Sequence, residues 1–391
     1  MLNFTFCVPT KFVFGRDAEL RAGEEIRLIG GTKALIHYGG GSVIRSGLMA
    51  RVTKSLDEAG VSYVMLGGAV PNPRDTKVYE GIELARREKC DCVLAVGGGS
   101  AIDSAKAIAH GVVYDGDFWD LWNGKATVQK TLPLGCVLTL SATGTESSDS
   151  AVIMQESTKL KRGLSTEFNR PRFALMNPAL TATLPPYQVA CGVTDIMAHI
   201  MERYFTNEPH VNVTDNLCEA LLKTVIQYAP RAYRDPADYD AQAEIMWAGT
   251  LAHNNTCGVG RVGDWASHQI EHELSALYDV AHGAGLAVVF PAWMRYNVTH
   301  DVMRFARFAV NVWGCDMNYE DPMMTAMNGI ERYERFLKSI GMPITLRELG
   351  ANPDDIPALA AKVKRGADGM TGSFVKLDTA KIEALLKIAD R

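Results

Sequence analysis

Short apolar runs alternate with amphipathic stretches over the first half of the chain. The apolar runs, predicted as strands, are residues 34–38, 62–66, 92–96 and 133–138. The stretches with helical spacing, predicted as the intervening helices, are residues 43–58, 75–88 and 101–109. This alternation is typical of a doubly wound, Rossmann-like α/β domain with a parallel sheet. We expect residues 4–14 to add a strand pair at one edge of that sheet.

The pattern changes at the sequence Leu-Pro-Pro that begins at Leu184. Beyond it the β-branched runs disappear, and helix-compatible segments follow almost to the end of the chain. The sequence therefore predicts a dinucleotide-binding α/β domain at 1–184 and an all-α domain at 185–391. A length of 391 residues fits two domains.

Composition narrows the classes of ligand. Charged residues make up 22% of the chain and the net charge is -5, which gives no basic surface field for nucleic acid. The eight cysteines are scattered, without the spacing of a disulfide or zinc framework. The N-terminus lacks the basic and apolar regions of a signal peptide, and the most apolar stretch, 283–294, is short and contains Pro291. We expect a cytoplasmic protein that binds small molecules and has no membrane partner.

Two glycine runs, 39–42 and 97–100, each follow a predicted strand and open a predicted helix. Glycines allow a backbone to approach a pyrophosphate closely, and the free N–H groups at a helix start favour an anion. Ser100 is expected to cap its helix, with Asp103 in the first turn. The alternative is that both runs are only turns that require a positive φ.

Neither run completes the G-x-G-x-x-G fingerprint, because Ile44 and Ile102 occupy the third position after the last glycine. The position after the first strand is Gly39, so no acidic side chain is available there for a ribose 2′-hydroxyl. This leaves room for a 2′-phosphate, with Ser42 and Arg45 as neighbours. The interpretation favours NADP(H), with NAD(H) possible.

Histidines and a carboxylate occur at ligand spacing in the second half. Asp195 and His199 are four residues apart, as are His268 and His272, and His282 follows. On a helix this spacing places both side chains on one face. Imidazoles with one carboxylate suit Fe²⁺ or Zn²⁺. The alternative is that these histidines pack in the core or lie on the surface. The motif H-E-x-x-H is absent, which argues against a zinc protease.

Several segments, in this order, closely resemble the iron-containing (group III) alcohol dehydrogenase family, and within it the butanol dehydrogenase and NADPH-dependent aldehyde reductase branch. The matching segments are residues 9–15, 38–43, 71–73, 96–103, 142–146 and 265–294. The resemblance covers nearly the whole chain. It departs from the family pattern at Asn177, where an acidic residue commonly precedes proline, and we expect this to affect a turn rather than the chemistry.

The resemblance implies a role for each matching residue. The implied metal ligands are Asp195, His199, His268 and His282. The implied cofactor-binding residues are Gly39, Ser42, Gly97, Gly98, Gly99, Ser100, Thr139, Ser141, Thr143 and Lys161. His272 is placed beside the nicotinamide, and Asp103 and Ser148 near the substrate, as catalytic residues. The alternative for Asp103 is support of a helix start, for Lys161 an exposed position, and for Ser148 the end of a turn.

These features together predict a metal-dependent alcohol dehydrogenase or aldehyde reductase acting on a small primary alcohol or aldehyde such as butanol or butanal. The resemblance also implies a homodimer, with residues 4–14 as a candidate for pairing across it. A competing hypothesis is a metal- and NAD-dependent cyclising lyase resembling dehydroquinate synthase. Such an enzyme needs basic residues to hold a phosphorylated substrate, and the segments around the predicted ligands offer few. A second alternative is a non-enzymatic binding module, in which the histidines pack a core and the glycines make turns.

Overall fold

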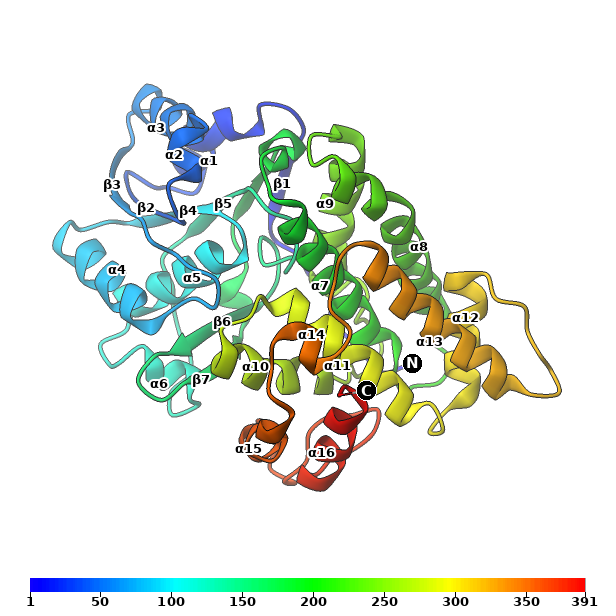
Figure 1. The fold of residues 1–391 in the computed structure, drawn as a ribbon. Helices are drawn as coiled ribbons and strands as arrows, with labels where there is room; N and C mark the ends of the chain where they lie inside the picture. The colour runs from blue at the N-terminus through cyan, green and yellow to red at the C-terminus, as the bar shows by residue number, and fades with distance from the viewer. Residues whose placement is uncertain (391) are drawn as a thin grey trace. The chain divides into compact units, whose positions relative to one another are not determined.

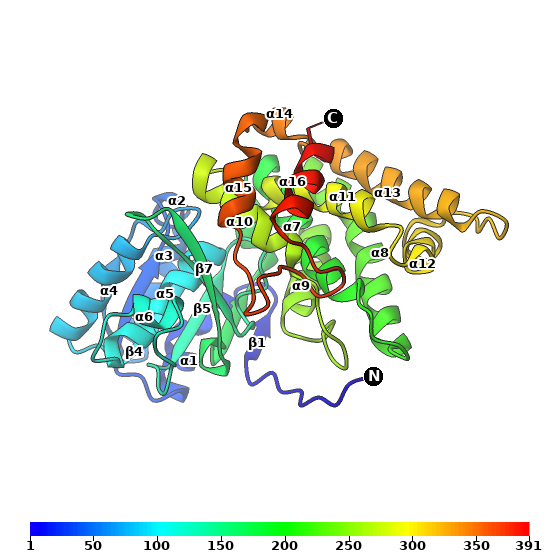
Figure 2. The same ribbon diagram turned by 90° about the horizontal axis from the view of Figure 1, so that it is seen from below.

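A computed structural model describes residues 1–390, which form two compact units. One unit comprises Cys7–Leu184, and the other comprises Pro185 onward together with Met1–Phe6. The first six residues are held in the helical unit by hydrogen bonds. The Met1 amino group donates to the Pro209 carbonyl at 2.9 Å, and the Leu2 amide donates to the Gly260 carbonyl at 2.9 Å. Figure 1 and Figure 2 show the course of the chain.

The α/β unit is built on a six-stranded sheet in the order β1-β8-β5-β4-β2-β3, in which every neighbouring pair is parallel. Its strands are β1 (Lys11–Phe14), β2 (Lys33–Tyr38), β3 (Ser62–Leu66), β4 (Cys92–Gly97), β5 (Leu134–Leu138) and β8 (Phe173–Met176). Every residue of β4 and β5 is buried, which is why these strands read as continuous apolar runs. The predicted fold class is therefore confirmed for this unit.

Helices cover both faces of the sheet. They are α1 (Ala22–Leu28), α2 (Ser42–Arg45), α3 (Leu48–Glu58), α4 (Asp75–Arg87), α5 (Gly99–Val113) and α6 (Trp119–Trp122). On one face, Ile26 and Val52 from α1 and α3 share a core with Ile36 of β2. On the other, Val78 of α4 and Ile108 of α5 pack with Leu35, the residue before Ile36 in the same strand. Successive residues of a strand point to opposite faces, so β2 contributes to both cores.

The structure differs from the sequence expectations at several places in this unit. Residues 43–58 form two helices rather than one, because Gly47 between them has a φ of 72°. Residues 4–14 supply only β1, paired in parallel with β8, instead of a strand pair. Strand β8 and the antiparallel hairpin of β6 (Ser150–Gln155) and β7 (Leu160–Ser165) are additional elements.

The second unit is helical, as predicted. Its longer helices are α7 (Pro186–Tyr204), α8 (Asn212–Arg234), α9 (Tyr239–His253), α10 (Ala266–Tyr278), α11 (His282–Asn297), α12 (Val302–Trp313), α13 (Pro322–Ser339) and α16 (Thr379–Ile388). Two short helices, α14 (Leu346–Leu349) and α15 (Ile356–Lys362), lie between α13 and α16 along the chain. Helix α7 packs against α8, α9 and α11, so nearly all of its side chains are buried. Among the described residues, no helix combines the length and apolarity needed to cross a membrane.

Candidate metal centre and cofactor loops

The four predicted metal ligands converge within the helical unit. Asp195 and His199 lie one turn apart on α7, His268 lies in the first turn of α10, and His282 is the first residue of α11. Asp195 Oδ1 is 3.3 Å from His199 Nδ1, 3.8 Å from His268 Nε2 and 3.7 Å from His282 Nε2. Two ligand atoms that are each about 2.1 Å from one tetrahedral ion lie roughly 3.4 Å apart. Ligand atoms of Asp195, His268 and His282 also lie within 4.8 Å of one another, so these three residues suit a single bound ion, while His199 lies next to Asp195 but outside that group.

Three atoms of this cluster are buried without a hydrogen-bond partner among the described residues: Asp195 Oδ1, His199 Nδ1 and His268 Nε2. Buried polar atoms in folded proteins are nearly always satisfied, and an exception calls for a specific explanation such as an ion. They are an oxygen and two nitrogens of the kind that bind Fe²⁺ or Zn²⁺. Asp195 and His268 also belong, with His282, to the group whose ligand atoms all lie within 4.8 Å of one another. The residues present therefore fit a divalent metal.

The electrostatic environments of two of the predicted ligands, His268 and His199, differ. Burial lowers the pKa of His268, but the neighbouring Asp195 and Glu202 outweigh this effect and raise it to about 9. Burial lowers the pKa of His199 well below its usual value, and the adjacent His253 and His268 add to that effect. The carboxylates thus stabilise positive charge at His268, whereas burial and the neighbouring histidines keep His199 neutral. A neutral imidazole is the form that ligates a metal.

Two carboxylates that the sequence analysis assigned no role contact the outer nitrogens of two ligands. Glu202 Oε1 is 2.8 Å from His268 Nδ1, and Glu271 Oε2 contacts His282 Nδ1. Glu202 lies one turn beyond His199 on α7, so its helical spacing was an available signal. Glu271 lies three residues after His268, and nothing in that spacing indicates that it reaches α11.

His272 lies one turn beyond His268, largely buried, with its ring centroid 5.7 Å from that of His282. It therefore borders the ligand cluster on the side of His282. Its predicted place beside the nicotinamide stays a prediction.

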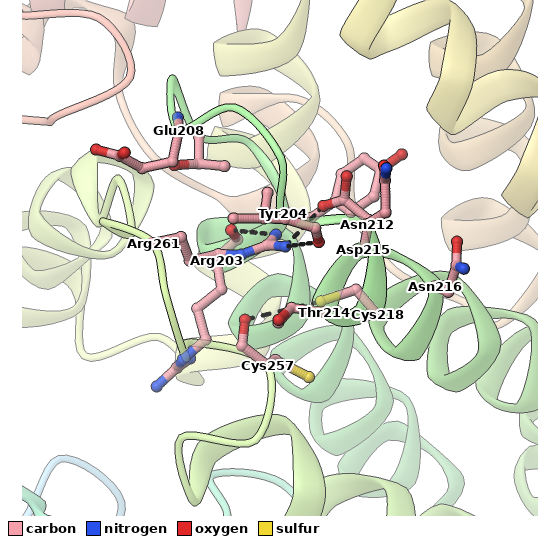
Figure 3. A network of polar contacts seen from close by, with 12 residues as sticks. Arg203, Tyr204, Glu208, Asn212, Thr214, Asp215, Asn216, Cys218, Cys257 and Arg261 are labelled. Carbon is pink, nitrogen blue, oxygen red and sulfur yellow. Dashed lines mark hydrogen bonds and ion pairs between the residues drawn. The ribbon is translucent and has the colours of Figure 1, made fainter. Parts of the chain in front are cut away.

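A polar network ties the carboxyl end of α7 to the segments around it (Figure 3). The Arg203 guanidinium donates to the His199 carbonyl at 2.8 Å and lies 4.5 Å from the ring centroid of Trp265. Fully buried Arg261 pairs with Asp215 of α8 at 2.7 Å and donates to the Arg203 carbonyl at 3.1 Å. These contacts fix α7 relative to α8 and to the segment that leads into α10, which carry or adjoin the ligands.

In the α/β unit, all of the predicted cofactor residues except Lys161 lie at or after the ends of three neighbouring strands. The register pairs Tyr38 at the end of β2 with Val96, and Gly97 at the end of β4 with Leu138 of β5. The two glycine runs and the segment 139–143 therefore leave the same edge of the sheet side by side. Because β3 lies on one side of β2 and β4 on the other, this is also a topological switch point. Such points are where open α/β sheets bind nucleotides.

The glycines in these runs are not needed for unusual dihedral angles, and those of the run 97–100 provide space. None of the six, all within the described residues, has a positive φ, so the interpretation as simple positive-φ turns is wrong. A Cβ at Gly99 would lie 2.7 Å from Thr143 Oγ1, and one at Gly97 would lie 2.7 Å from the Ala101 Cβ. The Thr139 amide also donates to the Gly97 carbonyl at 3.0 Å. The run 97–100 is thus packed closely on the 139–143 segment.

Two expectations about the start of α5 are wrong. The N-cap is Gly98, without a side-chain cap, and Ser100 lies inside the helix, where its carbonyl accepts from Ser104 Oγ at 2.8 Å. Asp103 lies beyond the first turn. Its carboxylate accepts from Thr145 Oγ1 at 2.5 Å and from the Val152 amide at 2.9 Å. The cause is that α5 begins two residues earlier than the periodicity indicated.

The remaining predicted residues are buried in the α/β unit. Lys161 is only 4% exposed and donates to Asn72 Oδ1 at 3.0 Å. The alternative interpretation, an exposed lysine on the surface, is therefore wrong. Ser148 exchanges hydrogen bonds of 3.3 Å with the backbone of Ser150. Ser141 Oγ is buried without a hydrogen-bond partner among the described residues, so it is available to a ligand. The substrate roles of Asp103 and Ser148 stay predictions.

Asn177, the departure from the family pattern, lies in a turn. Its Oδ1 accepts from the Ala179 amide at 3.0 Å, and its Nδ2 donates to Glu19 Oε2 at 2.9 Å. An acidic residue at this position could keep the first bond, but it would face the carboxylate of Glu19. The amide therefore suits this turn.

Residues 9–178 match the family model described as iron-containing alcohol dehydrogenase, and residues 189–389 match that of the C-terminal part of the same family. The chain belongs to the iron-containing alcohol dehydrogenase family. It is 41% identical over 388 residues to NADH-dependent butanol dehydrogenase A of Clostridium acetobutylicum, covering 99% of each chain. It is 36% identical over 377 residues to the NADPH-dependent aldehyde reductase YqhD of Escherichia coli, covering 95% of each.

Solved structures of the iron-containing alcohol dehydrogenase family have the same fold. The crystal structure of an NADH-dependent butanol dehydrogenase A from Thermotoga maritima superposes with a TM-score of 0.96 at 40% identity, covering 100% of this chain and 99% of that one. The chain is accordingly an oxidoreductase of the alcohol dehydrogenase and aldehyde reductase class. The cyclising lyase is not favoured.

Proposed function

We propose that this enzyme catalyses the metal-dependent, reversible transfer of hydride between NADP(H) and a small primary alcohol or aldehyde, such as butanol or butanal. The observation that carries the proposal is the group formed by Asp195, His268 and His282, whose ligand atoms lie within 4.8 Å of one another. Asp195 Oδ1 and His268 Nε2 in this group are buried without hydrogen-bond partners among the described residues. Membership of a family whose relatives include butanol dehydrogenases and an aldehyde reductase supports it.

In this proposal, Asp195, His199, His268 and His282 hold one Fe²⁺ or Zn²⁺. The ion, when bound, supplies Lewis-acid stabilisation of negative charge on the substrate oxygen. His272 takes up the hydroxyl proton at a ring nitrogen and passes it to water during alcohol oxidation, and it returns the proton during aldehyde reduction. Asp103 and Ser148 are the catalytic residues that we place near the substrate.

The cofactor is held by the α/β unit. The N–H groups of the run 97–100 at the start of α5 bind the pyrophosphate, because the helix dipole favours an anion there. The Ser141 hydroxyl, together with Thr139 and Thr143, binds on the nicotinamide side. The Lys161 ammonium donates to a ribose hydroxyl. These groups set the position of the nicotinamide ring, and position is a large part of hydride-transfer catalysis.

A substrate panel tests the reaction. Short-chain aldehydes, butanal among them, should be reduced with net oxidation of the reduced cofactor, followed by its absorbance. The rate should fall after chelation and return when Fe²⁺ or Zn²⁺ is added back. Turnover without a net change in cofactor would instead support a lyase, and activity unaffected by complete metal removal would contradict the proposal.

The roles of the two histidines on α10 can be separated by substitution. His268→Ala should remove both bound metal and turnover, because it deletes a ligand. His272→Ala should slow turnover and change its pH profile while metal content stays at the wild-type level. Elemental analysis of each purified variant gives the answer, and loss of metal from His272→Ala would refute the assignment.

The preference for NADP(H) rests on Gly39 and on the exposed Ser42 and Arg45 beside it. The relatives differ in this respect: the Clostridium acetobutylicum enzyme is named NADH-dependent and the Escherichia coli enzyme NADPH-dependent. We expect a higher kcat/KM with NADPH than with NADH. Arg45→Ala should reduce that ratio roughly tenfold, the effect of losing one charge-assisted contact of about 1.4 kcal/mol. A higher kcat/KM with NADH in the unsubstituted enzyme would rule the preference out.

We further propose that the enzyme is a homodimer. Strand β1 is an edge of the sheet, and Phe14 at its end is 42% exposed. Phe4 and Phe6 ahead of it are 54% and 47% exposed. An open strand edge and exposed apolar side chains each favour pairing with a second copy. Sedimentation should give the mass of a dimer, and the double variant Phe4→Lys, Phe6→Lys should shift it toward the monomer.

A further inference from the structure

We propose that Glu271 is a positioning residue of the metal centre, whose buried carboxylate holds His282 with Nε2 turned toward Asp195. The proposal rests on the metal-dependent function proposed above. It assigns a role to a residue outside the ligand set, and it predicts which imidazole nitrogen binds the ion.

The contacts of Glu271 account for both of its oxygens. The side chain is completely buried on α10; Oε2 contacts His282 Nδ1, and Oε1 accepts from Ser275 Oγ. When the Nδ1–H of an imidazole is donated to a carboxylate, the lone pair stays on Nε2. In His282 that atom lies 3.7 Å from Asp195 Oδ1. Glu271 therefore sets both the tautomer and the orientation of this ligand.

His268 repeats this arrangement, which indicates that it is not accidental. Its Nδ1 is 2.8 Å from Glu202 Oε1, and its Nε2 is 3.8 Å from Asp195 Oδ1. Glu202 has a second task, because its carboxylate also accepts from the backbone amides of Trp265 at 2.5 Å and His268 at 3.1 Å. Removing Glu202 would disturb the start of α10, so Glu271 allows the cleaner experiment.

The chain leaves space for this carboxylate at Gly285. A Cβ there would lie 2.6 Å from Glu271 Oε1 and 2.7 Å from Glu271 Cγ. Gly285 lies within α11 and lacks a positive φ, so its backbone conformation does not require glycine. Glycine is instead required at position 285 because a side chain there would occupy the space of the Glu271 carboxylate. Substituting Gly285 is therefore a second way to displace Glu271 while keeping its charge.

A direct role for Glu271 as a ligand fits less well. Glu271, His272 and His282 do offer three ligand atoms within 4.8 Å of one another. However, Glu271 Oε2 is occupied by His282 Nδ1, and the cluster that lacks hydrogen-bond partners among the described residues surrounds Asp195. The geometry therefore assigns Glu271 to the imidazole rather than to an ion.

Zn²⁺ affinity of the metal-depleted protein, measured by competition with a chromophoric chelator, tests the proposal without an activity assay. Carboxylates behind ligating histidines typically contribute 10–100-fold to metal affinity. Glu271→Ala should weaken binding by about that factor. Glu271→Gln should weaken it less, because the amide oxygen still accepts from Nδ1–H. The Co²⁺-substituted protein should show a changed visible spectrum in Glu271→Ala and a nearly normal one in Glu271→Gln.

The matched control is Glu334→Gln. Glu334 is also a largely buried glutamate of the helical unit, and it binds Arg295 through two contacts of 2.8 Å. Its substitution should lower stability and leave Zn²⁺ affinity unchanged. If Glu271→Ala does not fold, Gly285→Ala takes its place, and it should weaken Zn²⁺ binding although every carboxylate is retained.

The inference would be overturned if Glu271→Gln and the second variant, either folded Glu271→Ala or Gly285→Ala, both bound Zn²⁺ with an affinity within twofold of the unsubstituted protein. So would two ions per chain that fall to one in Glu271→Gln, since Glu271 would then be a ligand itself. Failure of the proposed metal-dependent function gives a distinguishable result, because the unsubstituted protein itself would then bind no Zn²⁺.

Discussion

Single residues in this enzyme are constrained by neighbours that are distant in sequence. Gly99 is the clearest case in the α/β unit, because a Cβ there would lie 2.7 Å from Oγ1 and 2.9 Å from Cγ2 of Thr143. The dihedral angles of Gly99 require no glycine, so only the closeness of the segment after β5 does. That closeness brings the N–H groups of α5 and the 139–143 segment to one edge of the sheet.

Gly99→Ala is expected to destabilise the protein by about 1–3 kcal/mol, the usual cost of forcing an extra methyl group into a packed site. NADP(H) affinity should also fall, because the two segments must separate. Denaturant unfolding and a fluorescence titration with NADPH measure the two effects. Gly163→Ala is the control, since its Cβ would meet Val152 Cγ2 at an ordinary 3.6 Å and nothing should change. Unaltered NADPH affinity in Gly99→Ala would mean that the packing does not shape the site.

At the scale of elements, the proposed metal centre depends on the close approach of two helices. A Cβ at Gly283 would lie 2.0 Å from the backbone oxygen of Cys191 on α7. Backbone atoms cannot move aside as a flexible side chain can. The first turn of α11 therefore rests directly on α7, and this contact places His282 beside Asp195.

Gly283→Ala should push α11 away from α7, cost about 3 kcal/mol or more in stability, and reduce Zn²⁺ affinity. Gly329→Ala is the matched control, because a Cβ there would clash with α12 at 2.5 Å from the Ala309 Cβ, again between two helices of this unit. It should lower stability without affecting the metal. Equal Zn²⁺ affinity in the two variants would show that the α7–α11 contact does not position the ligand.

At the scale of the whole molecule, two buried histidines couple stability to pH. His37 of β2 is fully buried with Nδ1 3.0 Å from the Leu66 carbonyl, and burial lowers its pKa to about 4. Burial likewise lowers the pKa of His110 to about 4. In the unfolded chain a histidine has a pKa near 6.5. Between these pH values the unfolded state binds more protons than the folded state. The contribution of these histidines to the free energy of unfolding is therefore complete above pH 6.5 and is lost as the pH falls toward 4.

The contribution of His37 to this loss is expected to be on the order of 3 kcal/mol, from the difference between 6.5 and about 4. His37→Gln should therefore lose less unfolding free energy than the unsubstituted protein between pH 7 and pH 4. Urea unfolding across this range makes the measurement, and exposed His210→Gln serves as the control. Parallel curves for His37→Gln and the unsubstituted protein would refute the assignment.

Prediction from sequence worked where the signal is local. Strands β2, β4 and β5 are predicted because central parallel strands are buried on both faces and read as apolar runs. It failed at β8 and at the hairpin of β6 and β7. Strand β8 has only four residues, and β7 carries Lys161 and Arg162, so its sequence is not that of a typical strand. Pairing with β1 and β5 makes β8 a strand, and pairing with β6 does so for β7.

For the candidate site too, local signals in the sequence were predictive and contacts between distant segments were not predicted. Helical spacing alone placed Asp195 with His199 and His268 with His272, and the family motifs added His282, because these features lie within short windows of the chain. The role of Glu271 was not predicted, because its partner His282 lies on another helix. Nearly every residue of α10 is buried, so the helix has no polar face that would distinguish Glu271.

The amino-acid sequence by itself thus determined the fold class of both halves, the edge of the sheet that carries the glycine runs, and the identity of Asp195 and of the histidines that gather around it. Spacing along one helix or strand is enough for each of these. Only the tertiary structure decided which atoms meet. The turn of each imidazole toward Asp195 depends on how closely α7, α10 and α11 pack and on the buried carboxylates behind the rings, and these are contacts between segments whose local sequences do not encode one another.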